Sequence, residues 1–226
     1  MTNTPTQSLA KPSIVYYETS TGFRIYLTSS ADSYVYLYNS EKYSWTTLGG
    51  VVPHPYYDGL PGAYQLETNS IYYSTSSFYD DSTLSTSSTY SWRLQIDSGF
   101  WSPVAPRPIE LVTRYSSALL NIGNSRLAVT GGAVIGNSVF SSMPYECISN
   151  KLQIWDLICG TWTALEVPGT NRIGHAAIFR NNSIILFGGS DGRLHNDMTT
   201  YPLSESQFPS SKTPRDTCKC IVRQLI

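Results

Sequence analysis

Hydrophobic residues occur along the chain in short runs, separated by small and polar residues typical of turns. The clearest pattern lies between Arg172 and Leu203, where the apolar runs His175–Phe179 and Ile184–Phe187 are separated by Asn181-Asn182. Such runs predict antiparallel strands joined by hairpins. The run Ile184–Phe187 is apolar without alternation, which is typical of a strand covered on both faces. This part of the chain therefore predicts a compact unit of antiparallel strands.

A similar unit occurs elsewhere in the chain. The segment Val35–Leu48 aligns without a gap on Leu152–Leu165, at a constant offset of 117 (152 − 35 = 117). Leu94–Val104 is a third copy with a shorter turn, and a fourth copy is weaker. The aromatic residues that mark the copies are Tyr38 with Trp45, Trp101, Trp155 with Trp162, and Tyr201 with Phe208. Repeated pairs of this kind predict a repeat architecture.

The first half of the unit also repeats. Arg114–Gly132 matches Arg172–Gly189, with Arg at both starts and Asn-Ser before the second strand. A glycine pair follows the second strand in both copies, at Gly131 and Gly132 and at Gly188 and Gly189. Glycine supplies the positive φ and the close backbone approach that larger residues disfavour.

Four units of four strands result, at about 13–49, 50–105, 106–166 and 167–209, with tails at 1–12 and 210–226 that fit no unit. The predicted strands of the first two units are Ile14–Tyr17, Arg24–Thr28, Tyr34–Tyr38, Trp45–Leu48, Gly62–Leu66, Ile71–Ser74, Trp92–Ile96 and Trp101–Val104. Those of the last two are Ser116–Leu120, Leu127–Thr130, Leu152–Asp156, Trp162–Leu165, His175–Phe179, Ile184–Phe187, Met198–Leu203 and a weak strand near Phe208.

The pattern resembles the kelch repeat, through the Arg-x-Gly-His sequence at Arg172–His175, the glycine pair after the second strand, and an aromatic residue seven positions before a tryptophan. The resemblance implies an all-β fold: a kelch-type β-propeller with one four-stranded antiparallel blade per unit. Kelch propellers usually have six or seven blades, so four units imply an incomplete propeller, with a closed four-blade ring as the alternative. We therefore expect apolar faces at its open ends and self-association through them.

The repeated aromatic residues are interpreted as packing rather than binding groups, because large rings on outer strands fill the space that opens between blades. Trp45, Trp101, Trp162 and Phe208 are expected to be largely buried at equivalent positions. His175 invites a metal or catalytic interpretation, but it occupies a position where the resembled family carries a structural histidine. We expect it to pack in the core.

Composition limits the classes of binding partner and the cellular locations that we expect for the chain. The net charge of −1 gives no basis for binding nucleic acid or an anionic membrane. The sequence has neither an 18-residue apolar run nor the apolar segment of a signal peptide near its start. As written, the chain is expected in the cytoplasm, with an extracellular site as the alternative if the N-terminus is truncated. In the latter case the sequon Asn181-Asn182-Ser183 becomes a glycosylation site.

No sequence motif for catalysis or cofactor binding is present: the carboxylates form no recognisable pair, and the three histidines have no metal-ligand spacing. The chain is therefore expected to be no enzyme and to hold no cofactor or metal.

Function is then expected in the loops. The segments Ser74–Tyr90 and Ala133–Asn150 both connect a second strand to a third, so they are predicted to project from the same rim. Their candidate partner-binding residues are Phe78, Tyr79, Val139, Phe140, Met143 and Tyr145. The alternative is that both are irregular Ser/Thr-rich insertions.

Three functions remain open. The leading one is a protein-interaction module that binds an unknown partner through rim loops, as kelch domains commonly do. The second is a fragment of a secreted or cell-surface ectodomain. The third is a fragment of an enzyme similar to galactose oxidase, a family that binds copper through Tyr and His and contains a Tyr crosslinked to Cys. The histidines of this chain match none of that family's motifs.

Overall fold

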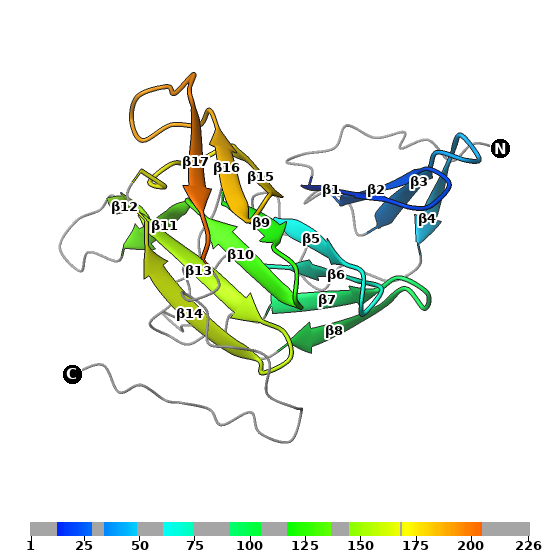
Figure 1. The fold of residues 1–226 in the computed structure, drawn as a ribbon. Helices are drawn as coiled ribbons and strands as arrows, with labels where there is room; N and C mark the ends of the chain where they lie inside the picture. Colours follow the sequence, from blue (N-terminus) through cyan, green and yellow to red (C-terminus); the bar gives the residue numbers. More distant parts are fainter. Residues whose placement is uncertain are drawn as a thin grey trace, which may run out of the picture.

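The structure is a computed structural model that describes residues 13–28, 34–48, 61–74, 91–104, 117–136, 145–167 and 169–204. Every regular element in these residues is a β-strand. No helix in the described residues is long and apolar enough to cross a membrane. Figure 1 shows the strands gathered into successive antiparallel sheets that follow one another as the blades of a propeller.

Blades one and two are complete four-stranded meanders. Blade one has the order β1-β2-β3-β4 and blade two the order β5-β6-β7-β8. The strands of blade one are β1 (Ser13–Glu18), β2 (Phe23–Thr28), β3 (Val35–Asn39) and β4 (Ser44–Leu48). Those of blade two are β5 (Gly62–Gln65), β6 (Ser70–Tyr73), β7 (Ser91–Gln95) and β8 (Phe100–Val104). The repeat predicted each of these strands to within one or two residues.

Blade three interrupts the meander with a hairpin. Its sheet has the order β9-β10-β13-β14, and β11 and β12 form a separate two-stranded sheet between its second and third strands. Its strands are β9 (Ala118–Asn121), β10 (Arg126–Thr130), β13 (Lys151–Asp156) and β14 (Thr161–Glu166). The hairpin consists of β11 (Ala133–Gly136) and β12 (Tyr145–Ile148). The sequence had predicted only a loop here, so the hairpin corrects that prediction.

Blade four has three strands within the described residues, β15 (Ala176–Arg180), β16 (Ser183–Phe187) and β17 (Met198–Pro202). The predicted fourth strand near Phe208 lies outside the described residues. His175 was expected inside the first strand, but β15 begins one residue later. The turn Asn181-Asn182 between β15 and β16 has positive φ at both residues, a conformation that asparagine tolerates better than most residues.

The first strands of the blades lie side by side: β1 contacts β5, β5 contacts β9, and β9 contacts β15. The cores lie between neighbouring blades. One cluster joins Val15 and Tyr26 of blade one to Tyr73 of blade two, and another joins Tyr72 of blade two to Trp155 of blade three. Each blade is thus covered on both faces wherever it has two neighbours.

The repeated aromatic residues are buried to different extents. Trp155 is fully buried and Trp101 is buried, but Trp45 and Trp162 are only half-buried. Trp155 and Trp162 are directly paired across β13 and β14 and stack with ring centroids 4.9 Å apart. Trp155, on the third strand of its blade, packs against Tyr72 of the preceding blade, whereas Trp162, on the outermost strand, stacks on Trp155 itself. The predicted burial of the outer-strand rings thus holds for Trp101 but not for Trp45 and Trp162, and Phe208 lies outside the described residues.

Candidate functional site

The junction between blades three and four is built from the repeated motif. The backbone N–H of Gly132 donates to the carbonyl of Arg172 (2.7 Å), and His175 Nε2 lies 2.8 Å from Thr130 Oγ1. A Cβ at Gly131 would overlap the Arg172 carbonyl and lie 2.5 Å from His175 Cε1. Gly131 also has φ of +56°, in the left-handed region. The glycine pair of one blade thus makes room for the Arg-x-Gly-His segment of the next.

His175 is a buried structural residue at this junction. Burial, with the nearby positive charge of Arg172 as a smaller cause, lowers the pKa of its imidazole to about 4. The side chain is therefore neutral near pH 7 and shares a hydrogen bond with the buried Thr130 hydroxyl. This arrangement suits packing and leaves the ring no access to a solvent-borne substrate.

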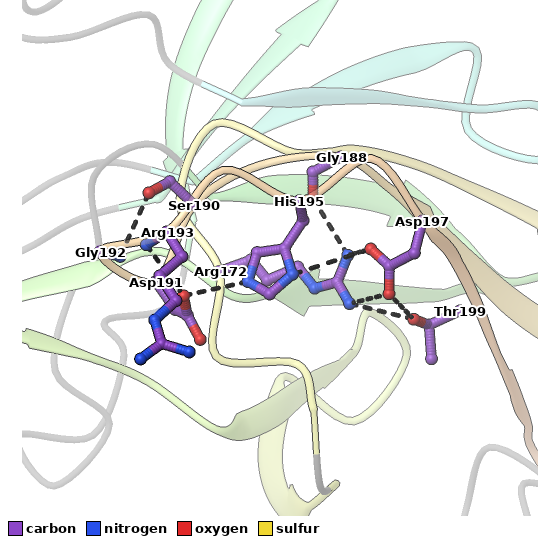
Figure 2. A network of polar contacts seen from close by, with 9 residues as sticks. All are labelled: Arg172, Gly188, Ser190, Asp191, Gly192, Arg193, His195, Asp197 and Thr199. Atoms are coloured by element: carbon purple, nitrogen blue, oxygen red, sulfur yellow. Dashed lines mark hydrogen bonds and ion pairs between the residues drawn. The ribbon is translucent and has the colours of Figure 1, made fainter.

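The side chain of Arg172 holds the connection between β16 and β17 in place. Figure 2 shows its guanidinium bound to both carboxylate oxygens of Asp197, at 2.6 and 2.8 Å. The same guanidinium donates to the Gly188 carbonyl (3.1 Å) and to the Thr199 hydroxyl (3.0 Å). A bidentate, charge-assisted pair is strong and directional, so both ends of the connection are fixed to one buried side chain.

This pairing changes the titration of both groups. The hydrogen bond from Arg172 lowers the pKa of the Asp197 carboxyl to about 2, and the hydrogen bond to Asp197 raises the pKa of Arg172. The ion pair therefore persists over the whole physiological pH range.

The tip of the same connection is a tight hydrogen-bonded turn. The Asp191 carboxylate accepts from the Arg193 N–H (3.2 Å), and the His195 N–H donates to the Gly189 carbonyl (2.9 Å). His195 Nε2 also lies 3.0 Å from Asp191. The backbone N–H of Arg193, followed by the His195 side chain, lowers the pKa of Asp191. The turn presents Leu194 with 93% of its surface exposed.

The base of the β11–β12 hairpin is bonded to the same structure. The Ser149 N–H donates to the Gly132 carbonyl (2.9 Å), and the Gly132 N–H donates to Arg172. Backbone hydrogen bonds therefore connect the hairpin to the segment that carries the Arg172 side chain. We call residues 131–136, 145–150 and 188–197 together the rim site.

Of the predicted partner-binding residues, only Tyr145 belongs to the part of the chain that the structure describes. Phe78, Tyr79, Val139, Phe140 and Met143 lie outside the described residues, as does Arg114. Tyr145 is the first residue of β12, and only its backbone is described. The segment 133–150 does reach the rim site, through its hairpin. Leu194 and Asp197 were missed by sequence reasoning, although the Asp-Gly turn at 191–192 had marked the loop itself.

The polar side chains of the rim site are engaged in contacts within the protein. Within the described ranges, no group of three or more His, Cys, Asp or Glu side chains is placed to hold a metal ion. The cluster of Asp191, His195 and Asp197 has its carboxylates engaged by Arg172 and by backbone N–H groups. What it offers a ligand is a fixed backbone, alternating charges and one exposed leucine.

Comparison with known proteins agrees with this architecture. The family model described as Attractin/LZTR1 beta-propeller matches residues 21–199. The Caenorhabditis elegans protein tag-53 is 27% identical over 123 residues, which is 54% of this chain and 9% of that protein. The chain thus spans less than a tenth of the length of this relative.

Proposed function

Since the chain belongs to the Attractin/LZTR1 beta-propeller family, we propose that it is a non-enzymatic protein-interaction module whose partner binds at the rim site. Propellers of this kind commonly serve protein binding, and their partners usually meet the loops rather than the strands. The second-to-third strand connections of blades three and four supply those loops here.

The observation that carries the proposal is Leu194. A single exposed apolar residue on a flexible loop would mean little. Leu194, however, lies at the tip of a turn whose ends are held by the buried side chain of Arg172. A loop that is ordered before binding loses less entropy when the complex forms. A fixed apolar side chain with a polar surround has the anatomy of an interface anchor.

The hairpin extends the surface. In the sequence, β11 and β12 are joined by residues 137–144, which include Val139, Phe140 and Met143 and lie outside the described residues. We propose that these apolar residues and Leu194 contact the same partner.

The test compares proteins captured by the intact chain and by Leu194→Asp. A buried anchor contributes about 2 kcal/mol or more, so capture of the true partner should fall at least about tenfold. Leu66→Asp is the matched control, because Leu66 is 72% exposed but lies in the β5–β6 turn, on the opposite rim. Binding of each candidate is then repeated with purified components.

A second variant, Phe140→Ser with Met143→Ser, examines the hairpin tip. We expect it to reduce binding of the same partner as Leu194→Asp. If every protein that binds the chain is retained by both variants, the rim site is not the binding surface.

A further inference from the structure

Exposed apolar side chains mark one end of blade two. Leu66, in the β5–β6 turn, is 72% exposed, and Phe100, at the start of β8, is 67% exposed. The turns at this end connect first to second and third to fourth strands, so they lie at the rim opposite the rim site. Blade two has a neighbour on each face, since β5 contacts both β1 and β9. The exposure of these two side chains is therefore a property of an interior blade.

Hydrogen bonds join the two turns at this end. Figure 1 shows the β5–β6 and β7–β8 turns at the same end of blade two. The Ile96 N–H donates to the Asn69 carbonyl (3.3 Å), and the Asn69 side-chain amide donates to the Asp97 carboxylate (2.8 Å). The Tyr64 hydroxyl donates in turn to Asn69 Oδ1 (3.2 Å). These contacts order the turns before a partner binds, which lowers the entropy lost on binding. We call residues 66–69 and 96–100 the blade-two end surface.

The blade-two end surface is acidic. Glu67 and Asp97 are the only acidic residues in the ranges 61–74 and 91–104, and both are exposed. Arg93 is the only basic residue in these ranges, and its guanidinium donates to Ser70 Oγ (2.9 Å) and to Gln95 rather than to a carboxylate. No ion pair within the described residues includes Glu67 or Asp97. Their negative charges are thus available to a cation on a partner.

The two carboxylates lie near one hydroxyl group. Burial raises the pKa of Tyr64, and the nearby Tyr17, Asp97 and Glu67 raise it further. Asp97 is held there by Asn69, which also accepts the Tyr64 hydroxyl. A single basic side chain placed beside this hydroxyl therefore meets both negative charges.

Strand pairing sets the spacing of the two apolar side chains. Gln65 pairs with Ser70, Ser70 with Gln95, and Gln95 with Phe100, so these four residues form one row across the blade. Leu66 directly follows Gln65. Neighbouring strands are about 4.8 Å apart, so three steps separate the β5 and β8 backbones by about 14 Å. Residues four positions apart in an extended chain span about 13 Å. An extended segment with apolar residues four positions apart therefore matches this spacing.

We propose that the blade-two end surface binds an extended segment of a partner protein, with a Lys or Arg midway between two apolar residues that lie four positions apart. The apolar residues contact Leu66 and Phe100, and the basic residue meets Glu67 and Asp97. The apolar contacts supply most of the affinity, whereas the exposed charges supply specificity and speed association. This surface is separate from the rim site and does not rest on partner binding at Leu194.

Selection of displayed peptides tests the proposal. Random linear peptides on phage are selected on the immobilised full chain and depleted on the double variant Leu66→Asp with Phe100→Asp. Far-ultraviolet circular dichroism checks that this variant is folded, and Glu67→Lys, a change of one exposed turn residue, serves for depletion if it is not. We expect the remaining sequences to share a Lys or Arg with an apolar residue two positions away on each side. A remaining pool without this motif would overturn the proposal.

One selected peptide is then labelled, and its binding is measured by fluorescence anisotropy. Glu67→Lys should raise its Kd at least about tenfold, as should Glu in place of the basic residue of the peptide, and the two changes together should restore part of the binding. Leu194→Asp is the control for the rim site. Ile158→Asp is the control for the same rim, because Ile158 is 55% exposed between β13 and β14 of the next blade. Both controls should bind like wild type. Binding that is unchanged in Glu67→Lys, or lost in Leu194→Asp, contradicts the proposal.

Discussion

Two junctions between neighbouring blades are held together by different kinds of contact. They are the junction between blades one and two and the junction between blades three and four. At the first, rings and aliphatic side chains meet: Tyr17 and Tyr64 stack with centroids 3.8 Å apart, and Tyr73 is fully buried nearby. At the second, the backbone of Gly132 bonds to Arg172, and His175 bonds to Thr130. The repeat motif is thus one way to join blades, and a tyrosine-rich core is another.

The difference explains why blade one has so little of the motif. By strand pairing Thr28 corresponds to Thr130, so the sequence has Ser29-Ser30 where blade three has Gly131-Gly132. Thr28 is buried at the end of β2, and the contact with blade two is made by Val15, Tyr26 and Val35. Where side chains supply the contact, no close backbone approach is needed, so the glycines are dispensable.

The largest effect is expected from the aromatic junction. Tyr73→Ala removes a fully buried ring from the cluster that joins blades one and two. We expect the free energy of unfolding in urea to fall by about 3–5 kcal/mol, as for other buried aromatic residues. Tyr73→Phe keeps the ring and should cost much less. A loss below about 1 kcal/mol for Tyr73→Ala would show that the rings do not hold this junction together.

The next effect contrasts two glycines. In Gly131→Ala the new methyl group overlaps the Arg172 carbonyl, and the positive φ adds strain. We expect a loss of about 3 kcal/mol. At Gly62 the nearest atoms to a Cβ are side-chain atoms of Val15 and Tyr73 rather than backbone, and φ is not positive, so Gly62→Ala should cost less, about 1–2 kcal/mol. Equal losses in urea unfolding would contradict the distinction between backbone and side-chain junctions.

The strands were predictable because their signals are local. The turn residues Asn124, Asn181 and Asn182 have the positive φ that their sequence context suggested, and Gly131 and Gly188 do as well. The alternating or continuous apolar runs between these turns then determine where each strand begins and ends.

The candidate site was less predictable because its contacts are distant in sequence. Arg172 and Asp197 are 25 residues apart, and no pattern marks Asp197 as the partner. The seven-residue spacing of Trp155 and Trp162 identified a cross-strand pair but not which ring is inside, because burial depends on the neighbouring blade. The β11–β12 hairpin also escaped detection, since Ala133–Gly136 is short and directly follows another strand.

The polar junction should also be sensitive to pH. The pKa of His175 is about 4 in the folded protein and about 6.5 when unfolded. Between these values the unfolded chain binds a proton that the folded chain does not, so stability falls as pH is lowered from about 7 toward 4. From pH 7 to pH 5 we expect a loss on the order of 2 kcal/mol from this group.

The control for this effect is His175→Gln, which keeps a polar side chain next to Thr130 but does not titrate. Its unfolding free energy should depend less on pH between 7 and 5 than that of wild type. Asp197 does not interfere, because its contribution to stability changes mainly between its ordinary pKa of 3.8 and its folded pKa of about 2, below the pH range compared here. Parallel curves for the two proteins would show that His175 is not buried in its neutral form.

The smallest effect on global stability is expected at the rim site, from Asp197→Asn. The asparagine keeps the shape of the side chain but removes the charge that pairs with the buried guanidinium of Arg172. The Asp197 side chain is half exposed, so water replaces much of the lost interaction and the blades stay joined. The loop should nevertheless loosen, because Arg172 is its only side-chain link to the blade junction among the described contacts. Hydrogen exchange should therefore quicken at the His195 amide, which donates to Gly189, while amides of β10 and β13 keep their protection.

Asp191→Asn is the matched control: it weakens the tip of the turn but leaves the Arg172 pair intact, so exchange at Gly188 should not change. If Asp197→Asn leaves the exchange of His195 unaltered, the order of the loop does not depend on Arg172, and the preorganisation that supports partner binding at Leu194 has another source.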